Sequence, residues 1–330
     1  MRTPWLAVLT LAGAFVVGAC AQGVTPVPES ATAASTASAR KAITVVATFS
    51  ILGDLVHNVG RERIRLVTLV GPDGDAHTFE PAPADARSLA TAALIFANGA
   101  DFEPWLDDLY AASGSQAKRV VVSEGLPLLA PTAAGRTSAI SVPATWSPSP
   151  GQADPHAWQD VTLVQRMVER IRDALMAADP DGNEIYRAWA ESYLVELRAM
   201  DAWIRAQVAT IPASRRTLVT AHDALGHFAR QYGFEVVGAG LGSTTESADP
   251  SAAQLRAIVA DIRAAGVPAI FAENIANSRL MSQIASEAGV KLVSELYTDA
   301  LGADGTPGAT YLGMMRFNVE SIVGALRAGG

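Results

Sequence analysis

The chain has 330 residues, with 25 Lys and Arg against 33 Asp and Glu, a net charge of -8 and a sequence pI near 5.2. This acidic balance argues against a nucleic-acid partner. With 49% hydrophobic and 18% charged residues, the composition is that of a globular protein long enough for two domains with their own cores.

The first 21 residues are typical of an export signal. Arg2 precedes an apolar run from Trp5 to Val17, which is too short for a membrane span and is followed by polar sequence. The cleavage site has two interpretations, and both stay open. In the favoured one, Val17 to Cys20 forms a lipobox, the signal covers residues 1–19, and Cys20 is lipidated. In the other, Ala19 to Ala21 fits the rule for ordinary signal peptidase. We therefore expect an exported protein, periplasmic or at the cell surface; under the lipobox interpretation, a lipid on Cys20 is its one attachment to the membrane.

Residues 22–42 are rich in Ala, Ser, Thr and Pro and predict a flexible tether. After it, β-rich runs alternate with helical stretches in two sets of four, which predicts an α/β fold with two lobes, each a four-stranded parallel sheet flanked by helices. The expected strands are Ile43–Phe49, Ile64–Val70, Ala93–Asn98, Arg119–Ser123, Thr217–Ala221, Phe234–Ala239, Pro268–Glu273 and Val290–Leu296.

One long helix is expected between the two sets, over residues 183–210. It contains neither Gly nor Pro, and its apolar residues recur every three or four positions, which predicts a single buried stripe. Such a rod can join two lobes rigidly, although periodicity alone fits a core helix of one domain equally well. We therefore expect an N-terminal lobe over 43–182, a linking helix over 183–210 and a C-terminal lobe over 211–330. The expected stripe consists of Ile185, Trp189, Tyr193, Leu197, Met200, Ile204 and Val208.

Four side chains lie in short loops next to the expected strands and helices. His77 follows the second strand, His156 precedes the helix expected from Val161, His222 follows the fifth strand and Asp299 follows the last. Ligands of open parallel sheets bind beyond the carboxyl ends of the strands. Any one of these residues alone is more simply a turn former or a solvated side chain, but two per lobe at equivalent places predict a metal site in the cleft. Three imidazoles and one carboxylate suit Zn²⁺ and leave room for Mn²⁺ or Fe²⁺. Since Cys20 is the only cysteine, thiolate ligation is excluded.

The two remaining histidines are left out of this site. His57 is expected on the surface or at the end of the first helix. His227 lies five positions after His222, whereas residues on one helix face are three or four apart.

The chain resembles the metal-specific solute-binding proteins of ABC importers, the family of zinc- and manganese-binding lipoproteins, from about Ile43 to the C-terminus. The resemblance implies that His77, His156, His222 and Asp299 are the ligands, that the long helix joins two lobes, and that a membrane permease with its ATPase receives the ion. The stretches that carry it occur in the family's order and are residues 74–81 with Asp85, 98–106, 154–158, 221–224, 271–273 and 297–302.

Two departures from the family's pattern stand out. Ala76 replaces a usual Pro, which is expected to loosen the loop of His77 without removing a ligand. Residues 131–153 contain neither His nor a carboxylate, so they lack the His- and acid-rich loop of many zinc-binding members.

The third ligand position bears on the metal. His222 stands where manganese-binding members commonly have Glu, and imidazole in place of carboxylate favours Zn²⁺ as the transported ion. Some members with three His and one Asp are nevertheless implicated with manganese, and a bidentate Asp299 would tolerate Mn²⁺. Zinc is therefore predicted, with manganese or iron as the alternative.

Release requires protonation or distortion of the site, because coordinating histidines must be neutral. Our hypothesis is that docking on the permease moves the second lobe and pulls His222 and Asp299 away from His77 and His156. Four carboxylates are near enough in sequence to hold the imidazoles, with Glu273 the best candidate: Asp75, Glu80, Asp223 and Glu273.

Two other classes of protein, a zinc hydrolase and a binding protein for a large organic ligand, fit the sequence less well. A zinc hydrolase would need an open coordination position and a general base, and the chain has no H-E-x-x-H pair, so no enzyme activity is expected. A helix-linked binding protein for a siderophore or cobalamin would leave the four matched ligands unexplained.

Overall fold

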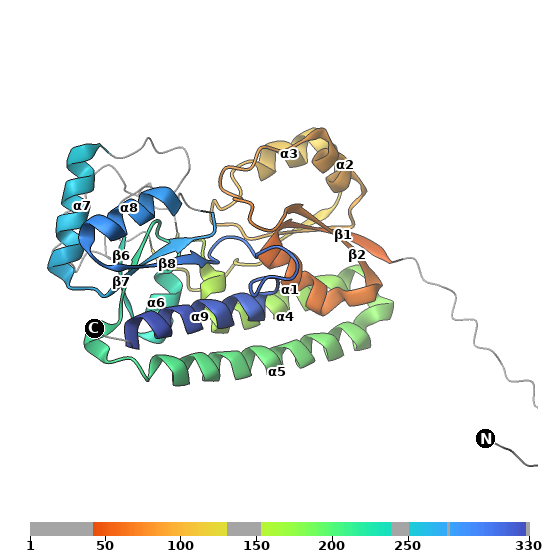
Figure 1. The fold of residues 1–330 in the computed structure, drawn as a ribbon. Helices are drawn as coiled ribbons and strands as arrows, with labels where there is room; N and C mark the ends of the chain where they lie inside the picture. Colours follow the sequence, from red (N-terminus) through yellow and green to blue (C-terminus); the bar gives the residue numbers. More distant parts are fainter. Residues whose placement is uncertain (1–41, 131–152, 239–250, 276–277, 328–330) are drawn as a thin grey trace, which may run out of the picture. The chain divides into compact units, whose positions relative to one another are not determined.

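The computed structural model describes residues 42–130, 153–238, 251–275 and 278–327, and Lys41–Gly330 forms one compact unit (Figure 1). The export signal, the lipid on Cys20, almost all of the tether and residues 131–152 lie outside the described ranges, so the predictions for them stay predictions.

The first sheet is parallel and has the order β2-β1-β3-β4. Its strands alternate between two apolar faces: Val46 packs with α2 and α3, while Val45 and Ala47 face the core that contains α1. The elements are β1 (Ile43–Phe49), α1 (Ser50–Gly60), β2 (Ile64–Val70), α2 (Pro83–Thr91), β3 (Leu94–Ala97), α3 (Leu106–Ser113) and β4 (Lys118–Val121).

The second sheet repeats this arrangement, with the order β6-β5-β7-β8 and parallel pairing throughout. One face is covered by α7 and α8, and Leu218 and Phe271 on the other face join the large core. Both predicted four-stranded parallel sheets are thus confirmed. The elements are β5 (Thr217–Thr220), α6 (Gly226–Tyr232), β6 (Glu235–Gly238), α7 (Ala252–Ala265), β7 (Ala269–Glu273), α8 (Ser278–Ala288) and β8 (Lys291–Leu296).

Three long helices pack together beside the sheets: α4 (Val161–Ala178), α5 (Asn183–Val208) and α9 (Tyr311–Arg327) (Figure 1). The predicted long helix is α5. Its predicted stripe is correct from Tyr193 onward but wrong at the start, where Ile185 is 42% exposed and Tyr186 is buried. The predicted steps of four residues turn further than one helical turn of 3.6, so they drift off the buried face at this end.

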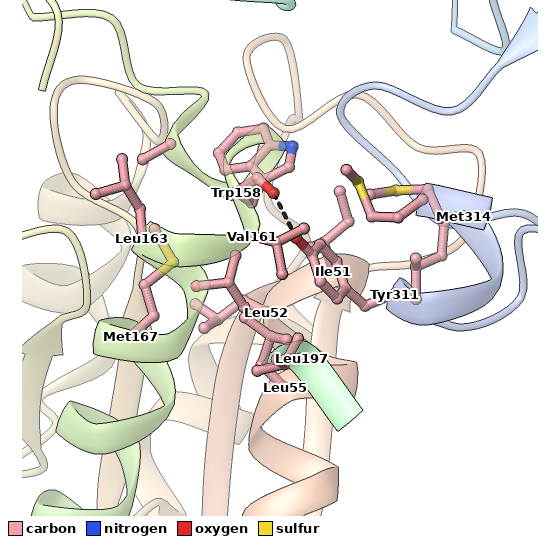
Figure 2. Close-up of a cluster of buried hydrophobic side chains, with 14 of the residues drawn as sticks. Ile51, Leu52, Leu55, Trp158, Val161, Leu163, Met167, Leu197, Tyr311 and Met314 are labelled. Carbon is pink, nitrogen blue, oxygen red and sulfur yellow. Dashed lines mark hydrogen bonds between the residues drawn. The ribbon is translucent and has the colours of Figure 1, made fainter. Parts of the chain in front are cut away.

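The core crosses from one lobe to the other. Side chains of α1, α4, α5 and α9 pack with Trp158 in one buried cluster, and the Tyr311 hydroxyl donates a hydrogen bond of 2.8 Å to the Trp158 carbonyl (Figure 2). One buried cluster contains Val45 of the first sheet and Phe271 of the second. Within the described ranges, none of the helices is long and apolar enough to cross a membrane.

Candidate metal centre

The structure brings the four predicted ligands together. His77 and His156 approach each other with their Nε2 atoms 3.4 Å apart. Both surround Asp299, with His77 Nε2 3.5 Å from Oδ2 and His156 Nε2 3.5 Å from Oδ1. His222 Nε2 completes the set at 3.0 Å from Asp299 Oδ2.

The separations among three of these side chains suit a cation between them. Ligands about 2.05 Å from a tetrahedral zinc ion are about 3.3 Å from one another, close to the 3.4–3.5 Å among His77, His156 and Asp299. Among the described residues, these three alone form a group of donor atoms that all lie within 4.8 Å of one another, and His222 Nε2 joins them through its 3.0 Å approach to Asp299. The carboxylate of Asp299 is fully buried, and its Oδ1 accepts no hydrogen bond from the described residues. A metal ion shared with the imidazole nitrogens would satisfy this buried oxygen.

Charge coupling within the cluster is strong. Burial opposes the charged form of His156, but the carboxylates of Asp299 and Asp154 outweigh it and raise the pKa to about 9. Burial likewise opposes the charged form of His222, whose pKa is nevertheless raised well above the usual value by Asp299 and Glu273. Burial would raise the pKa of Asp299, but His222 and His156 hold it well below the usual range. Without a metal ion, His156 and His222 are therefore protonated at neutral pH.

Two carboxylates face the outer nitrogens of the imidazoles. Asp154 Oδ1 lies 2.8 Å from His156 Nδ1 and also accepts the His156 backbone N–H at 3.0 Å. Glu273 Oε2 lies 3.5 Å from His222 Nδ1, while its Oε1 accepts the Ala221 N–H. The hydrogen bond to Asp154 fixes the tautomer of His156 so that Nε2 faces the centre of the cluster, whereas Glu273 Oε2 has no hydrogen-bond partner among the described residues and acts on His222 through its charge. Glu273 was expected in this role, whereas Asp154 was missed, although Asp-x-His occurs in both loops, at 75–77 and 154–156.

The other three proposed partners of the imidazoles act differently. Asp75 accepts the backbone N–H of His77 at 2.8 Å and the Thr78 hydroxyl at 2.9 Å, so it holds the loop and not the ring. Glu80 is exposed. Asp223 is half-buried, and burial and the charge of Asp154 raise its pKa.

The loop of His77 is firmly held despite the alanine at position 76. Ala76 is fully buried, and its carbonyl accepts the Trp105 indole N–H at 2.7 Å. Phe102 stacks edge-on against the His77 ring with 4.6 Å between ring centroids. Glu103 secures this wall because its carboxylate accepts the N–H groups of Asn98 and Gly99. The expectation of a loosened loop is not supported.

A β-bulge between β7 and β8 precedes Asp299 and changes the direction of the chain that leads to it. Ala272 of β7 lies opposite two residues of β8, and one of them, Glu295, adopts a left-handed conformation with φ 70°. Such a bulge redirects the end of a strand, here the end that leads to Asp299.

The segment around Asp299 is bonded to the first lobe. The Trp158 indole and the Gln159 amide both donate to the Thr298 carbonyl, at 2.7 and 2.8 Å. Leu301 N–H donates to the Ser50 hydroxyl at 2.9 Å, and its carbonyl accepts Asp73 N–H at 2.8 Å. Our hypothesis that Asp299 leaves with His222 on release therefore conflicts with the contacts, which group Asp299 with His77 and His156.

The two other histidines lie outside the cluster, as expected. His57 is exposed in the last turn of α1. His227 is fully buried on α6, and its Nε2 lies 3.2 Å from the Asp154 carbonyl.

The sequence of this chain matches those of a known protein family. Residues 45–325 match the family described as ZnuA, the periplasmic zinc-uptake complex component A. The chain belongs to this family. It is similar to the manganese-binding lipoprotein MntA of Halalkalibacterium halodurans, with 36% identity over 86% of this chain and 88% of the relative. The zinc-binding protein TroA of Treponema pallidum is 32% identical over 86% of this chain and 88% of its own length.

Solved structures agree with the family assignment. The structure of TroA from Treponema pallidum matches with a TM-score of 0.75 and 31% identity, over 87% of this chain and 99% of that one. A manganese-bound periplasmic metal-binding protein from Candidatus Liberibacter asiaticus matches with a TM-score of 0.74 and 25% identity, over 86% of this chain and 99% of that one. As a member of the ZnuA family, the protein is an exported metal-binding component of an ABC importer and not an enzyme.

Proposed function

We propose that the protein captures Zn²⁺ through His77, His156, His222 and Asp299 and delivers it to the permease and ATPase of an ABC importer. The observation that carries this proposal is the set of donor separations, 3.4–3.5 Å among His77, His156 and the buried Asp299, with His222 Nε2 3.0 Å from the same carboxylate. Nitrogen-rich sites of this size favour Zn²⁺ over Mn²⁺, the weakest binder of the first-row divalent series.

Manganese is the second candidate. Both oxygens of Asp299 face imidazoles, Oδ2 toward His77 and His222 and Oδ1 toward His156. A carboxylate that binds through both oxygens adds a fifth, harder ligand, which favours Mn²⁺. The similar MntA of Halalkalibacterium halodurans is named for manganese, and TroA of Treponema pallidum for zinc.

The two ions are separated by competition. The mature protein is stripped with chelator, titrated with Zn²⁺ against an excess of Mn²⁺, and the bound ions are counted by elemental analysis. About one Zn²⁺ per chain, retained against the excess, is expected; retention of Mn²⁺ instead would replace zinc by manganese as the transported ion.

The ligand assignment is tested in the same assay. Asp299→Ala removes the one anionic donor and is expected to weaken binding by about 100-fold or more. Asp304→Ala, an exposed carboxylate five positions further on, is the matched control and should bind as the parent does. Equal affinity of the Asp299 variant and the parent would remove Asp299 from the ligand set.

For delivery, we propose that His222 is the ligand withdrawn first. His222 follows β5 of the second sheet, whereas Asp299 is bonded to the first lobe together with His77 and His156. Displacement of the end of β5 by the permease, while residues 298 and 301 keep their bonds to the first lobe, thus withdraws one imidazole and opens the coordination sphere. A lipid on Cys20 would keep the loaded protein near that permease.

A further inference from the structure

Behind His156 lies a partly buried chain of hydrogen bonds that starts on the second lobe. His156 Nδ1 is 2.8 Å from the Asp154 carboxylate, and the Asp154 carbonyl is 3.2 Å from His227 Nε2 on α6. His227 Nδ1 in turn lies 3.3 Å from a guanidinium nitrogen of Arg230. The side chain of His227 is fully buried, although it takes no part in the ligand set.

The tautomer of His227 follows from its partners. A guanidinium group can only donate, so His227 Nδ1 accepts from Arg230. The proton of the neutral ring therefore resides on Nε2, which donates to the Asp154 carbonyl. Burial lowers the pKa of His227, in keeping with a neutral ring.

The peptide of Asp154 is consequently held on both sides. Its N–H donates to the Leu129 carbonyl at 2.9 Å, and its carbonyl accepts from His227. Since the Asp154 carboxylate fixes the His156 ring, the placement of this backbone sets the direction of the His156 Nε2 lone pair.

Gly226 permits this close approach of α6. A β-carbon at position 226 would lie 2.7 Å from Asp154 Oδ2 and 3.3 Å from Leu129. A contact this tight places α6 directly against the loop that carries His156.

We propose that His227 is a positioning residue of the metal site, which acts on His156 through Asp154. The inference rests on the proposed metal binding at His156. It gives this histidine a role in ion retention, across the boundary between the lobes, without direct contact with the ion.

The test uses the full mature protein and a pair of variants. His227→Leu removes the N–H donor and keeps an apolar side chain of similar bulk, whereas His227→Gln keeps an N–H at nearly the position of Nε2. Loss of the donor is expected to weaken Zn²⁺ binding by about 10-fold, the lower end of the range for partners of metal-bound histidine, and the Gln variant should restore it to within about 3-fold of the parent. His57→Leu, an exposed histidine, is the control and should change nothing.

Two further measurements separate positioning from packing. The visible absorption of the Co²⁺-loaded protein reports the geometry of the ligands and should shift in His227→Leu but not in His227→Gln. In an Asp154→Ala background, His227→Leu should add no further loss, because its effect passes through Asp154.

Three outcomes would overturn the proposal: parent-like affinity in the Leu variant, equal weakness in the Leu and Gln variants, or additive losses with Asp154→Ala. Failure of the parent protein to bind any of these ions would instead refute the proposed function itself, so the two failures are distinguishable.

Discussion

Asp299 is the residue on which the charge of the site depends. It is fully buried, and three imidazoles lie within 3.5 Å of its two oxygens. An ion that enters must replace protons, since Asp299 stabilises charged imidazoles in the metal-free protein. The raised pKa values of His156 and His222 mean that protons compete with the ion for these two rings at neutral pH.

The pH dependence of binding follows from these shifts. The pKa of His156 is about 9 in the folded protein, against about 6.5 for free histidine. Protonated His156 therefore stabilises the metal-free fold fully below about pH 6.5, and this contribution is lost as the pH rises toward 9. Apparent Zn²⁺ affinity should increase over the same range.

Calorimetric titrations in buffers of different ionisation enthalpy measure the protons released on binding. We expect release of about one proton for each histidine that is charged before the ion enters. Heats that are independent of the buffer at pH 7.5 would contradict charged histidines in the metal-free site.

Residue identity alone predicted the four side chains that the structure brings together, but only some of their partners. Glu273 ends a strand beside the one that leads to His222, so its place follows from topology. Asp154 was missed because the backbone of residues 154–156 must turn to bring its carboxylate onto His156 Nδ1, and this turn is not visible as a pattern. Asp75 stands in the same spacing to His77, yet it accepts from the backbone, since small differences in loop conformation decide which donor a carboxylate meets.

At the scale of elements, α4 links the loop of His156 to the core. The helix begins at Val161, directly after Asp160, whose buried carboxylate accepts Thr162 N–H at 2.8 Å and the Thr162 hydroxyl at 2.7 Å. This N-cap satisfies a backbone donor that would otherwise be buried without a partner.

Removal of the cap has a defined cost. Asp160→Ala should destabilise the protein by about 1 kcal/mol and lower the melting temperature by roughly 2 °C. Thermal unfolding of the metal-free variant measures the change. Asp173→Ala, which removes an exposed carboxylate on the same helix, should leave the melting temperature unchanged. Equal decreases in melting temperature for the two variants would show that the hydrogen bonds of the cap do not stabilise the protein.

Element boundaries were well predicted where β-branched runs are bounded by turn residues, as at Ile43–Phe49 and Ile64–Val70. The first turns of α5 were not, because both Ile185 and Tyr186 are apolar and the neighbouring helices select the aromatic residue for burial. Tyr186 also contacts polar partners, since its hydroxyl donates to Asp179 at 2.9 Å. Local periodicity contains no information about such partners.

At the scale of the whole molecule, the two sheets share one core. The buried cluster runs from Val45 through the long helices to Phe271, and polar bonds such as that from Tyr311 to Trp158 cross it. Wide separation of the lobes would expose this apolar surface to water, at about 25 cal/mol for each Å². Small shifts at the metal site are therefore cheaper than a broad hinge motion.

Shared core surface also predicts cooperative unfolding. The metal-free protein should unfold in a single calorimetric transition whose measured and van't Hoff enthalpies agree. Differential scanning calorimetry provides both values. Two resolved transitions would mean that the sheets unfold independently and that the shared core contributes little.

The absence of sulfur from the four ligand positions has a chemical consequence. The chain's only cysteine is Cys20, and the site combines three imidazoles with one carboxylate. Thiolates are oxidised by peroxide and exchange with disulfides, and either reaction expels a bound metal ion. Imidazole and carboxylate undergo neither, so the proposed site should keep its ion when the redox potential outside the cytoplasm changes.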